Sequence, residues 1–264
     1  VARPVIMGGR ERLPPVKRVE HLIVNPDDSY RTVVTHKSRE DGFRELLGLA
    51  RTATQEERWV YVPQRQTWYE VGYGAYTIPT TVERNGEVQT YTRPAIKSLE
   101  LLVRNLISGS NDLESVHIHP NISIDSRDLL EEEVKAQSRI SGGPPSYEDL
   151  IQLLMHVVRQ EEINPNGSYT EYVVSPLGVT KYELTPAGRE RYLKVKKERG
   201  EQAMYDRFTN DLPQNFGYDL SLDIEREDVQ IGIINGTCQK LSSPYLSVTF
   251  TPYTTFTPSE PQRP

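Results

Sequence analysis

Two histidines that stand one residue apart are the side chains in this 264-residue chain best suited to chemistry. They lie in the run His117-Ile118-His119-Pro120, and the chain contains only five histidines. On a β-strand, residues i and i+2 point to the same face, so both imidazoles would converge. Two imidazole nitrogens held in this way suit one metal ion. The alternative is a pair of ordinary surface or core histidines on a strand.

A second run, Pro145–Leu150 (PSYEDL), places Ser146 three residues before Asp149. Ahead of an apolar helical pattern, this spacing predicts a helix capping box. A helix N-terminus can also fix and aim a carboxylate, so Asp149 could be a metal ligand beside the Ser146 hydroxyl. Cys238 is the only cysteine, which excludes an internal disulfide framework and a cysteine-based zinc finger. A metal site must therefore use histidines and carboxylates.

Together, H-x-H-P at 117–120 and P-S-x-x-D at 145–149 resemble the signature of the JAMM (MPN+) zinc metalloprotease family. The resemblance covers roughly residues 25–185. It implies that His117, His119 and Asp149 hold Zn²⁺ and that Ser146 donates a hydrogen bond to the oxyanion. It also implies an upstream glutamate, at the start of a strand after the first helix, as the general base.

The chain departs from the family pattern in two places. A stretch of about residues 123–143 separates the two motifs, and we interpret it as an insertion bordering the site. Glu57 and Glu56 also lack the glycine that usually follows the upstream glutamate three residues later, whereas Glu45 has it in Gly48 but lies in the middle of an expected helix. The candidates, in order of preference, are Glu57, Glu56, Glu70 and Glu45.

The resemblance implies hydrolysis of an isopeptide or peptide bond at the C-terminus of ubiquitin or a ubiquitin-like protein. The substrate tail could pair with a sheet edge near Trp68–Tyr76. Three alternatives stay open. The chain could be a catalytically inactive MPN-type scaffold with partners in a protein assembly, or a relative in DNA-repair or phage-defence systems that acts on another substrate. It could also be a metal-free binding module in which both motifs are coincidental.

The periodicity predicts an α/β (α+β mixed) fold. The resemblance implies that this fold is an MPN-like central mixed sheet flanked by helices. A helix should follow Ser38 and end near Glu56, a second should begin at Pro94, and a third at Ser146. A polar stretch at 125–140 is compatible with a helix. Asn85-Gly86 is a hairpin-turn signal. Strands are expected at 31–35, 59–62, 68–78, 116–119, 170–174 and 179–184.

We expect three regions along the chain. Residues 1–24 form an extended lead-in, 25–186 the metalloprotease-like domain, and 187–264 a C-terminal accessory extension. In the extension, 187–203 should be a charged, exposed helix. The segments 218–224, 229–234 and 245–250 alternate like strands.

Composition excludes several classes of protein. The chain has 31 Lys and Arg against 37 Asp and Glu, a formal net charge of −6. This balance argues against a nucleic-acid partner bound by neutralising phosphates. No apolar run reaches the roughly 18 residues of a membrane helix. No signal-peptide pattern is visible, so we expect a cytoplasmic location, or a nuclear one if the source is eukaryotic.

Overall fold

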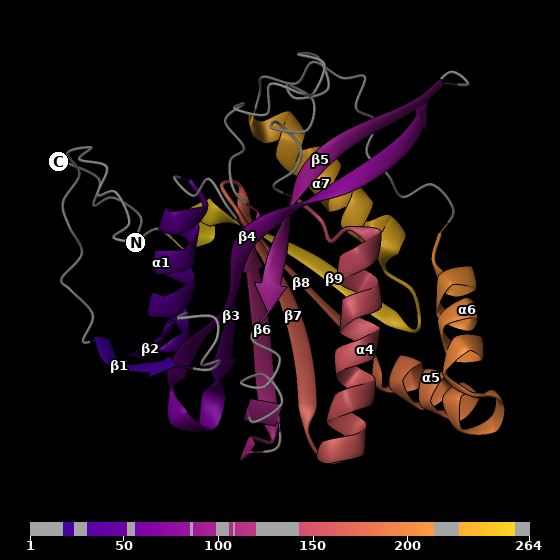
Figure 1. Cartoon of the computed structure of the whole chain (residues 1–264), viewed down its shortest axis with the longest axis horizontal. Coiled ribbons are helices and arrows are strands. Elements are labelled where there is room, and N and C mark those ends of the chain that lie inside the picture. Colours follow the sequence, from indigo (N-terminus) through magenta and orange to yellow (C-terminus); the bar gives the residue numbers. More distant parts are fainter. Residues whose placement is uncertain are drawn as a thin grey trace, which may run out of the picture.

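The structure is a computed structural model that describes residues 18–23, 31–51, 56–84, 87–98, 106–107, 109–119, 143–213 and 227–256. One mixed sheet of nine strands forms its centre, in the order β1-β2-β4-β3-β6-β7-β8-β9, with β5 paired to β4 (Figure 1). The strands are β1 (Arg18–Ile23), β2 (Arg31–His36), β3 (Glu57–Val62), β4 (Thr67–Arg84), β5 (Glu87–Ser98), β6 (Asp112–Ile118), β7 (Ser168–Ser175), β8 (Gly178–Leu184) and β9 (Leu246–Pro252).

Helices cover both faces of this sheet. They are α1 (Arg39–Ala50), α4 (Tyr147–Ile163), α5 (Pro186–Arg199), α6 (Glu201–Asp211) and α7 (Glu227–Leu241). The core against one face takes its helical residues from α1, and the core against the other face takes them from α4, α5, α6 and α7. The mixed α/β architecture expected from the sequence is therefore confirmed.

Alternation along β3 shows how one strand serves both cores. Trp59 and Tyr61 pack on the α1 side, whereas Val60 and Val62 pack on the α4 side. Successive side chains of a strand point to opposite faces, so burial at successive positions means that both faces of β3 are covered. The assignment of a side chain to one face or the other, which the sequence cannot make, follows from these two clusters.

Three predicted elements near the motifs are confirmed. Helix α1 begins after its N-cap Ser38, whose hydroxyl accepts from the Asp41 N–H, although the helix ends at Ala50 rather than near Glu56. Strands β4 and β5 form the predicted hairpin, in which Arg84 pairs with Glu87, and the predicted turn residues Asn85 and Gly86 lie outside the described residues. Helix α4 begins after Ser146 with both hydrogen bonds of the predicted capping box.

The helix predicted from Pro94 is wrong over residues 94–98. These residues belong to β5, where Pro94 pairs with Thr77 of β4. Within the described residues β5 pairs only with β4, so its outer side is an edge, where a residue without an N–H is tolerated. Pairing with β4 along the whole of β5 keeps these residues in a strand, although their apolar residues are spaced as in a helix.

The C-terminal region differs most from expectation. Residues 229–234, predicted as a strand, lie in α7, where Ile234, Cys238 and Leu241 are buried at helical spacing. The charged helix expected at 187–203 is two helices, α5 and α6. They break at Gly200, whose φ of 89° suits glycine.

The expected domain boundaries also change. Strand β9 pairs with β8, and α5 to α7 share one core with α4, so the region after residue 186 belongs to the same unit. Residues 18–23 of the lead-in form strand β1. Most of the predicted insertion, the helix-compatible stretch 125–140, and the strand at 218–224 lie outside the described residues.

Candidate metal centre

Three side chains from the two sequence motifs meet at one end of the sheet. The Nε2 atoms of His117 and His119 lie 3.1 Å apart, and His117 Nε2 lies 3.3 Å from Asp149 Oδ1. His119 Nε2 lies 3.8 Å from Asp149 Oδ2. His117 is buried, and the other two side chains are less than 15% exposed.

The fold explains this convergence. His117 lies near the end of β6, and His119 directly follows that strand, where its N–H bonds to the Val174 carbonyl of β7. Strands β6 and β7 are parallel, and α4 lies between them in the chain. A helix on such a crossover begins near the carboxyl end of the first strand, which brings Asp149, in the first turn of α4, to the two histidines.

The donor set fits a zinc ion. Two imidazole nitrogens and one carboxylate make three ligands, all with donor atoms within 4.8 Å of one another. Ligands about 2.0–2.1 Å from a tetrahedral ion lie about 3.3 Å apart. The Nε2–Nε2 distance of 3.1 Å and the distance of 3.3 Å from His117 Nε2 to Asp149 Oδ1 are close to this value. Three protein ligands leave a fourth position open, as in catalytic zinc sites. A metal-free cluster joined by hydrogen bonds is the alternative that this geometry permits.

Ser146 and Asp149 hold each other at the start of α4. The Ser146 N–H donates to Asp149 Oδ2 at 2.7 Å, and the Asp149 N–H donates to Ser146 Oγ at 3.2 Å. Asp149 therefore presents Oδ1 to His117 while Oδ2 accepts from the Ser146 N–H. The capping box and a ligand role for Asp149 are compatible in one geometry.

Electrostatics couple the members of this cluster. Burial alone lowers the pKa of His117, but the neighbouring Asp149 carboxylate raises that pKa above its ordinary value. Burial alone raises the pKa of Asp149, yet His117, His119 and the Ser146 N–H together hold it well below its usual range. Asp149 is therefore a carboxylate at neutral pH, as a metal ligand must be.

The four candidate glutamates do not share one face of the sheet. Glu57 lies opposite Ile118 and accepts from Trp59 Nε1 at 3.3 Å, so it lies on the α1 face, away from His117. Glu70 lies opposite Trp59 and shares that face. Glu45 lies on α1, where it pairs with Lys37.

Glu56 immediately precedes β3, two residues before Arg58. Arg58 lies opposite His117 and on the same face of the sheet. By strand alternation, Glu56 falls on the His117 face, at the end of β3 nearest the metal centre. The strand register thus favours Glu56 over Glu57, the reverse of the order expected from the sequence.

A buried polar network that the sequence analysis did not identify lies beside the metal centre. Arg58 Nη2 lies 2.7 Å from Glu171 Oε1, and both side chains are nearly fully buried. Ser115, Gln152 and His156 also contact this ion pair. The available signal was a charged residue two positions from apolar ones on the same face, with Arg58 before Val60 on β3 and Glu171 before Val173 on β7.

Glu171 does not have the properties of a general base, although it lies on the metal-centre face. Burial alone raises its pKa, but Arg58 and His156 lower it to about 2. A base works best when its pKa lies near the operating pH. Cys238, which is not expected to take part, is buried in the core, and burial raises its pKa to about 12.

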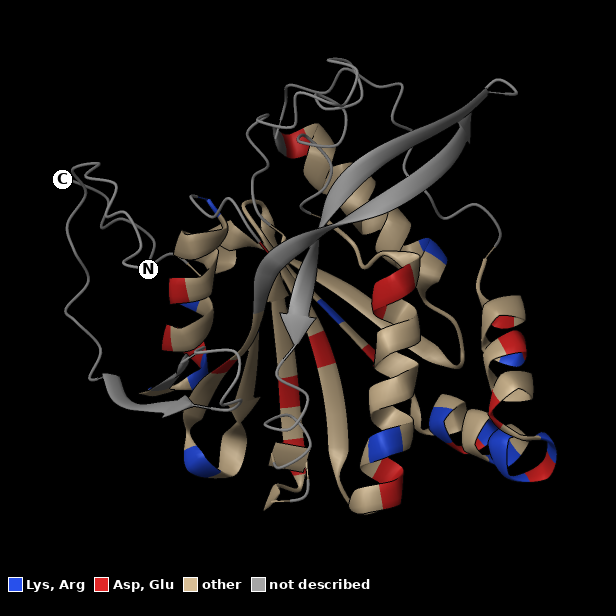
Figure 2. Cartoon of the chain, viewed as in Figure 1, with Lys and Arg blue, Asp and Glu red and all other residues tan. Residues whose placement is uncertain are grey.

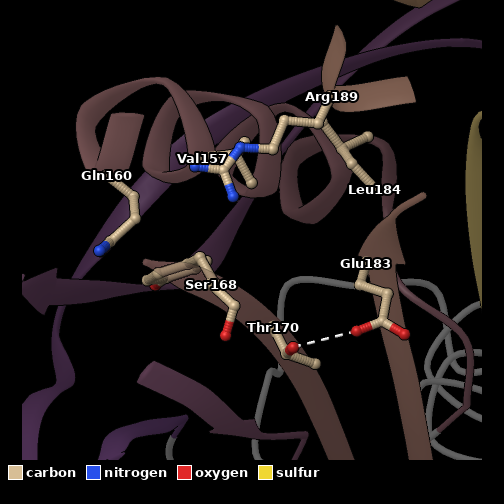
Figure 3. A pocket seen from close by; sticks show the side chains of 8 residues that line it. Val157, Gln160, Ser168, Thr170, Glu183, Leu184 and Arg189 are labelled. Carbon is tan, nitrogen blue, oxygen red and sulfur yellow. Dashed lines mark hydrogen bonds between the residues drawn. The ribbon is translucent and has the colours of Figure 1, made fainter. Parts of the chain in front are cut away.

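A separate small hollow lies between α4, β7, β8 and α5 (Figure 3). At one side of it Thr170 donates to Glu183, and at another Arg189 donates to Glu161 and to the carbonyls of Gly167 and Pro165. The guanidinium is therefore used to hold the α4–β7 connection against α5. We assign this hollow a structural role.

Comparisons with known proteins give no family assignment. No protein-family model, no curated protein and no solved structure matches the chain. The helices that the structure describes include none long and apolar enough to cross a membrane. Helix α5 is mostly basic (Figure 2), and two of its basic residues, Arg191 and Lys196, form ion pairs with Asp211 and Glu162.

Proposed function

We propose that this protein is a zinc-dependent hydrolase of amide bonds, with His117, His119 and Asp149 as the metal ligands. The observation that carries the proposal is the convergence of two imidazoles and one carboxylate from two separate motifs, with one donor atom of each within 4.8 Å of the others. A bound zinc ion would supply the Lewis acidity that activates a water molecule and polarises the substrate carbonyl.

The surrounding residues have roles that follow from their positions. Glu56 takes the proton from the attacking water and delivers it to the leaving amine. Ser146 Oγ accepts a hydrogen bond from the Asp149 N–H, which leaves the hydroxyl proton of Ser146 available to the developing oxyanion. One such donor contributes about 3 kcal/mol of transition-state stabilisation. The N-terminal end of α4 adds a favourable dipole for negative charge.

The proposed substrate class rests on the resemblance to JAMM metalloproteases. It is an isopeptide or peptide bond at the C-terminus of ubiquitin or a ubiquitin-like protein. The order of helix α1, strand β3, the H-x-H strand β6 and the capped helix α4 supports the resemblance. The expected tail-docking edge at Trp68–Tyr76 needs correction, since residues 68–69 pair with both β2 and β3, and 72–73 with both β3 and β5.

Metal content is the first test of this proposal. Purified wild-type protein, supplied with zinc, should carry about one zinc per chain by elemental analysis. The double variant His117→Ala/His119→Ala should carry none. His36→Ala is the matched control, because His36 is an exposed histidine on β2 that bonds to Thr67, and it should retain zinc.

Activity is the second test. Wild-type protein loaded with zinc should cleave ubiquitin chains or a ubiquitin C-terminal amide, and the double variant should not. A folded wild type that takes up no zinc would contradict the metal site. Zinc uptake without any hydrolysis would favour the alternative, an inactive MPN-type scaffold.

A further inference from the structure

We infer that Arg58 is a positioning residue of the metal centre. It holds the helix that carries Asp149 in register with the strand that carries His117. The inference rests on the proposed function, because it assigns a role to a residue that touches none of the three ligands in the contacts described above. It concerns metal affinity and ligand geometry rather than the chemical step.

The guanidinium of Arg58 spans three neighbouring strands. Arg58 starts on β3 opposite His117, passes Ser115 of β6 with an Nε–Oγ distance of 3.1 Å, and reaches Glu171 of β7. Ser115 lies two residues before His117, so it lies on the same face. The guanidinium therefore lies on the His117 face of the sheet, at the level of the paired residues Ser115 and Glu171.

The same guanidinium contacts α4. Its Nη1 donates to Gln152 Oε1 at 2.8 Å, and its Nη2 lies 3.3 Å from His156 Nδ1, which in turn lies 3.0 Å from Glu171 Oε1. Gln152 and His156 follow Asp149 by three and seven residues, so all three share one face of the helix. A shift of α4 along the sheet would break these bonds and carry Asp149 away from the histidines.

Physical chemistry favours Arg over a simpler anchor here. Its planar fork has several donors, so a single side chain can bond to β6, β7 and α4 at once. A buried ion pair adds little net stability compared with apolar residues of the same size. The ion pair instead fixes the geometry of the site. Residues that orient metal ligands without binding the metal act in the same way, and removing one typically lowers metal affinity about 10- to 100-fold.

The experiment measures zinc affinity by competition with a chromophoric chelator in three folded variants. Arg58→Met and Gln152→Ala should bind zinc about 10- to 100-fold more weakly than wild type. Arg39→Met is the matched control, since Arg39 pairs with Glu114 of the same strand β6 but on the opposite face of the sheet. It should bind zinc as wild type does.

A second readout separates positioning from stability. The double variant Arg58→Met/Glu171→Met removes the ion pair and should regain stability relative to Arg58→Met, while its zinc affinity stays low. The visible spectrum of the cobalt-loaded protein should also lose its tetrahedral intensity in Arg58→Met and Gln152→Ala.

Two results would overturn the inference while leaving the proposed function intact. One is wild-type zinc affinity in both Arg58→Met and Gln152→Ala. The other is full recovery of affinity in the double variant. A wild type that binds no zinc would instead remove the proposed function itself, and the inference with it.

Discussion

At the scale of single residues, the position of a carboxylate relative to the faces of the sheet decides its chemistry. Glu56 and Glu57 are adjacent, yet the β3–β6 register places Glu57 beside Ile118 and Trp59 on the α1 face. Successive residues of a strand point to opposite faces, so the preceding glutamate falls on the His117 face. Two neighbouring carboxylates thus lie on opposite faces of the sheet, and only Glu56 shares the face of His117.

This difference can be measured directly. Glu56→Gln should lower kcat about 10²- to 10⁴-fold, the usual contribution of a general base, with zinc content unchanged. Glu57→Gln should lie within a few-fold of wild type. Steady-state hydrolysis of a ubiquitin C-terminal amide, together with elemental analysis, tests both. A large loss in Glu57→Gln with none in Glu56→Gln would reverse the assignment.

Glu171 should make the stability of the protein depend on acid pH. Its pKa is depressed to about 2, because Arg58 and His156 outweigh the effect of burial. A depressed carboxyl pKa stabilises the fold above the unfolded pKa of about 4.3, and this stabilisation is lost as pH falls toward 2. At pH 7, Glu171→Gln should therefore lower the free energy of unfolding by an amount on the order of 3 kcal/mol.

Urea unfolding at a series of pH values tests this sign. The difference in free energy of unfolding between wild type and Glu171→Gln should narrow as pH falls from 5 to 2. The control is Glu183→Gln, whose carboxylate is 31% exposed and pairs with Lys181. The free energy of unfolding of this variant should stay near that of wild type, because partly exposed ion pairs contribute little to stability. If Glu171→Gln lowered the free energy of unfolding by the same amount at every pH, the depressed pKa of Glu171 would be contradicted.

At the scale of elements, close packing decides where helix α1 can lie. Gly42 faces the sheet, and a Cβ atom added there would lie 2.1 Å from the ring of Trp68, which is fully buried. Gly48, on the exposed side of the same helix, has no atom within 4 Å of such a position. The two glycines therefore respond to substitution in opposite ways.

Gly42→Ala should lower the free energy of unfolding by about 1–3 kcal/mol, because the indole and the helix must move apart. Gly48→Ala should raise it by up to about 1 kcal/mol, because alanine is the better helix former. Urea unfolding of both variants provides the comparison. Equal changes in the free energy of unfolding for the two variants would mean that α1 does not pack on Trp68 as described.

At the scale of the whole molecule, the chain folds around one sheet that includes its C-terminal region. Strand β9 pairs along the full length of β8, and buried residues of α5 to α7 belong to the same core as those of α4. Helix α4 carries Asp149, so the core that supports the candidate metal centre depends on residues after 186. The region expected to be an accessory extension is part of the scaffold.

A fragment spanning residues 1–186 should therefore fail to fold by itself. It should lack a cooperative urea transition and near-ultraviolet circular dichroism, since the edge of β8 and the α4 side of the core would be exposed to water. The full chain is the reference. A fragment with native-like spectra and zinc uptake would support the boundary near residue 186 that the sequence suggested.

The sequence alone determined the local features of the candidate site. The spacing of His117 and His119 needed only a strand, and the pair Ser146 and Asp149 needed only a helix start, so both follow from local geometry. The order of strands and helices around them was also readable, because amphipathic periods and caps are local signals.

Only the tertiary structure decided what depends on pairing between distant segments. The register of β3 on β6 chose between Glu56 and Glu57, and the hairpin with β4 made residues 94–98 a strand. Packing of Ile234, Cys238 and Leu241 against the sheet made α7 a helix. Arg58 and Glu171 meet across 113 residues of chain. Such contacts are set by burial and register, which no local pattern specifies.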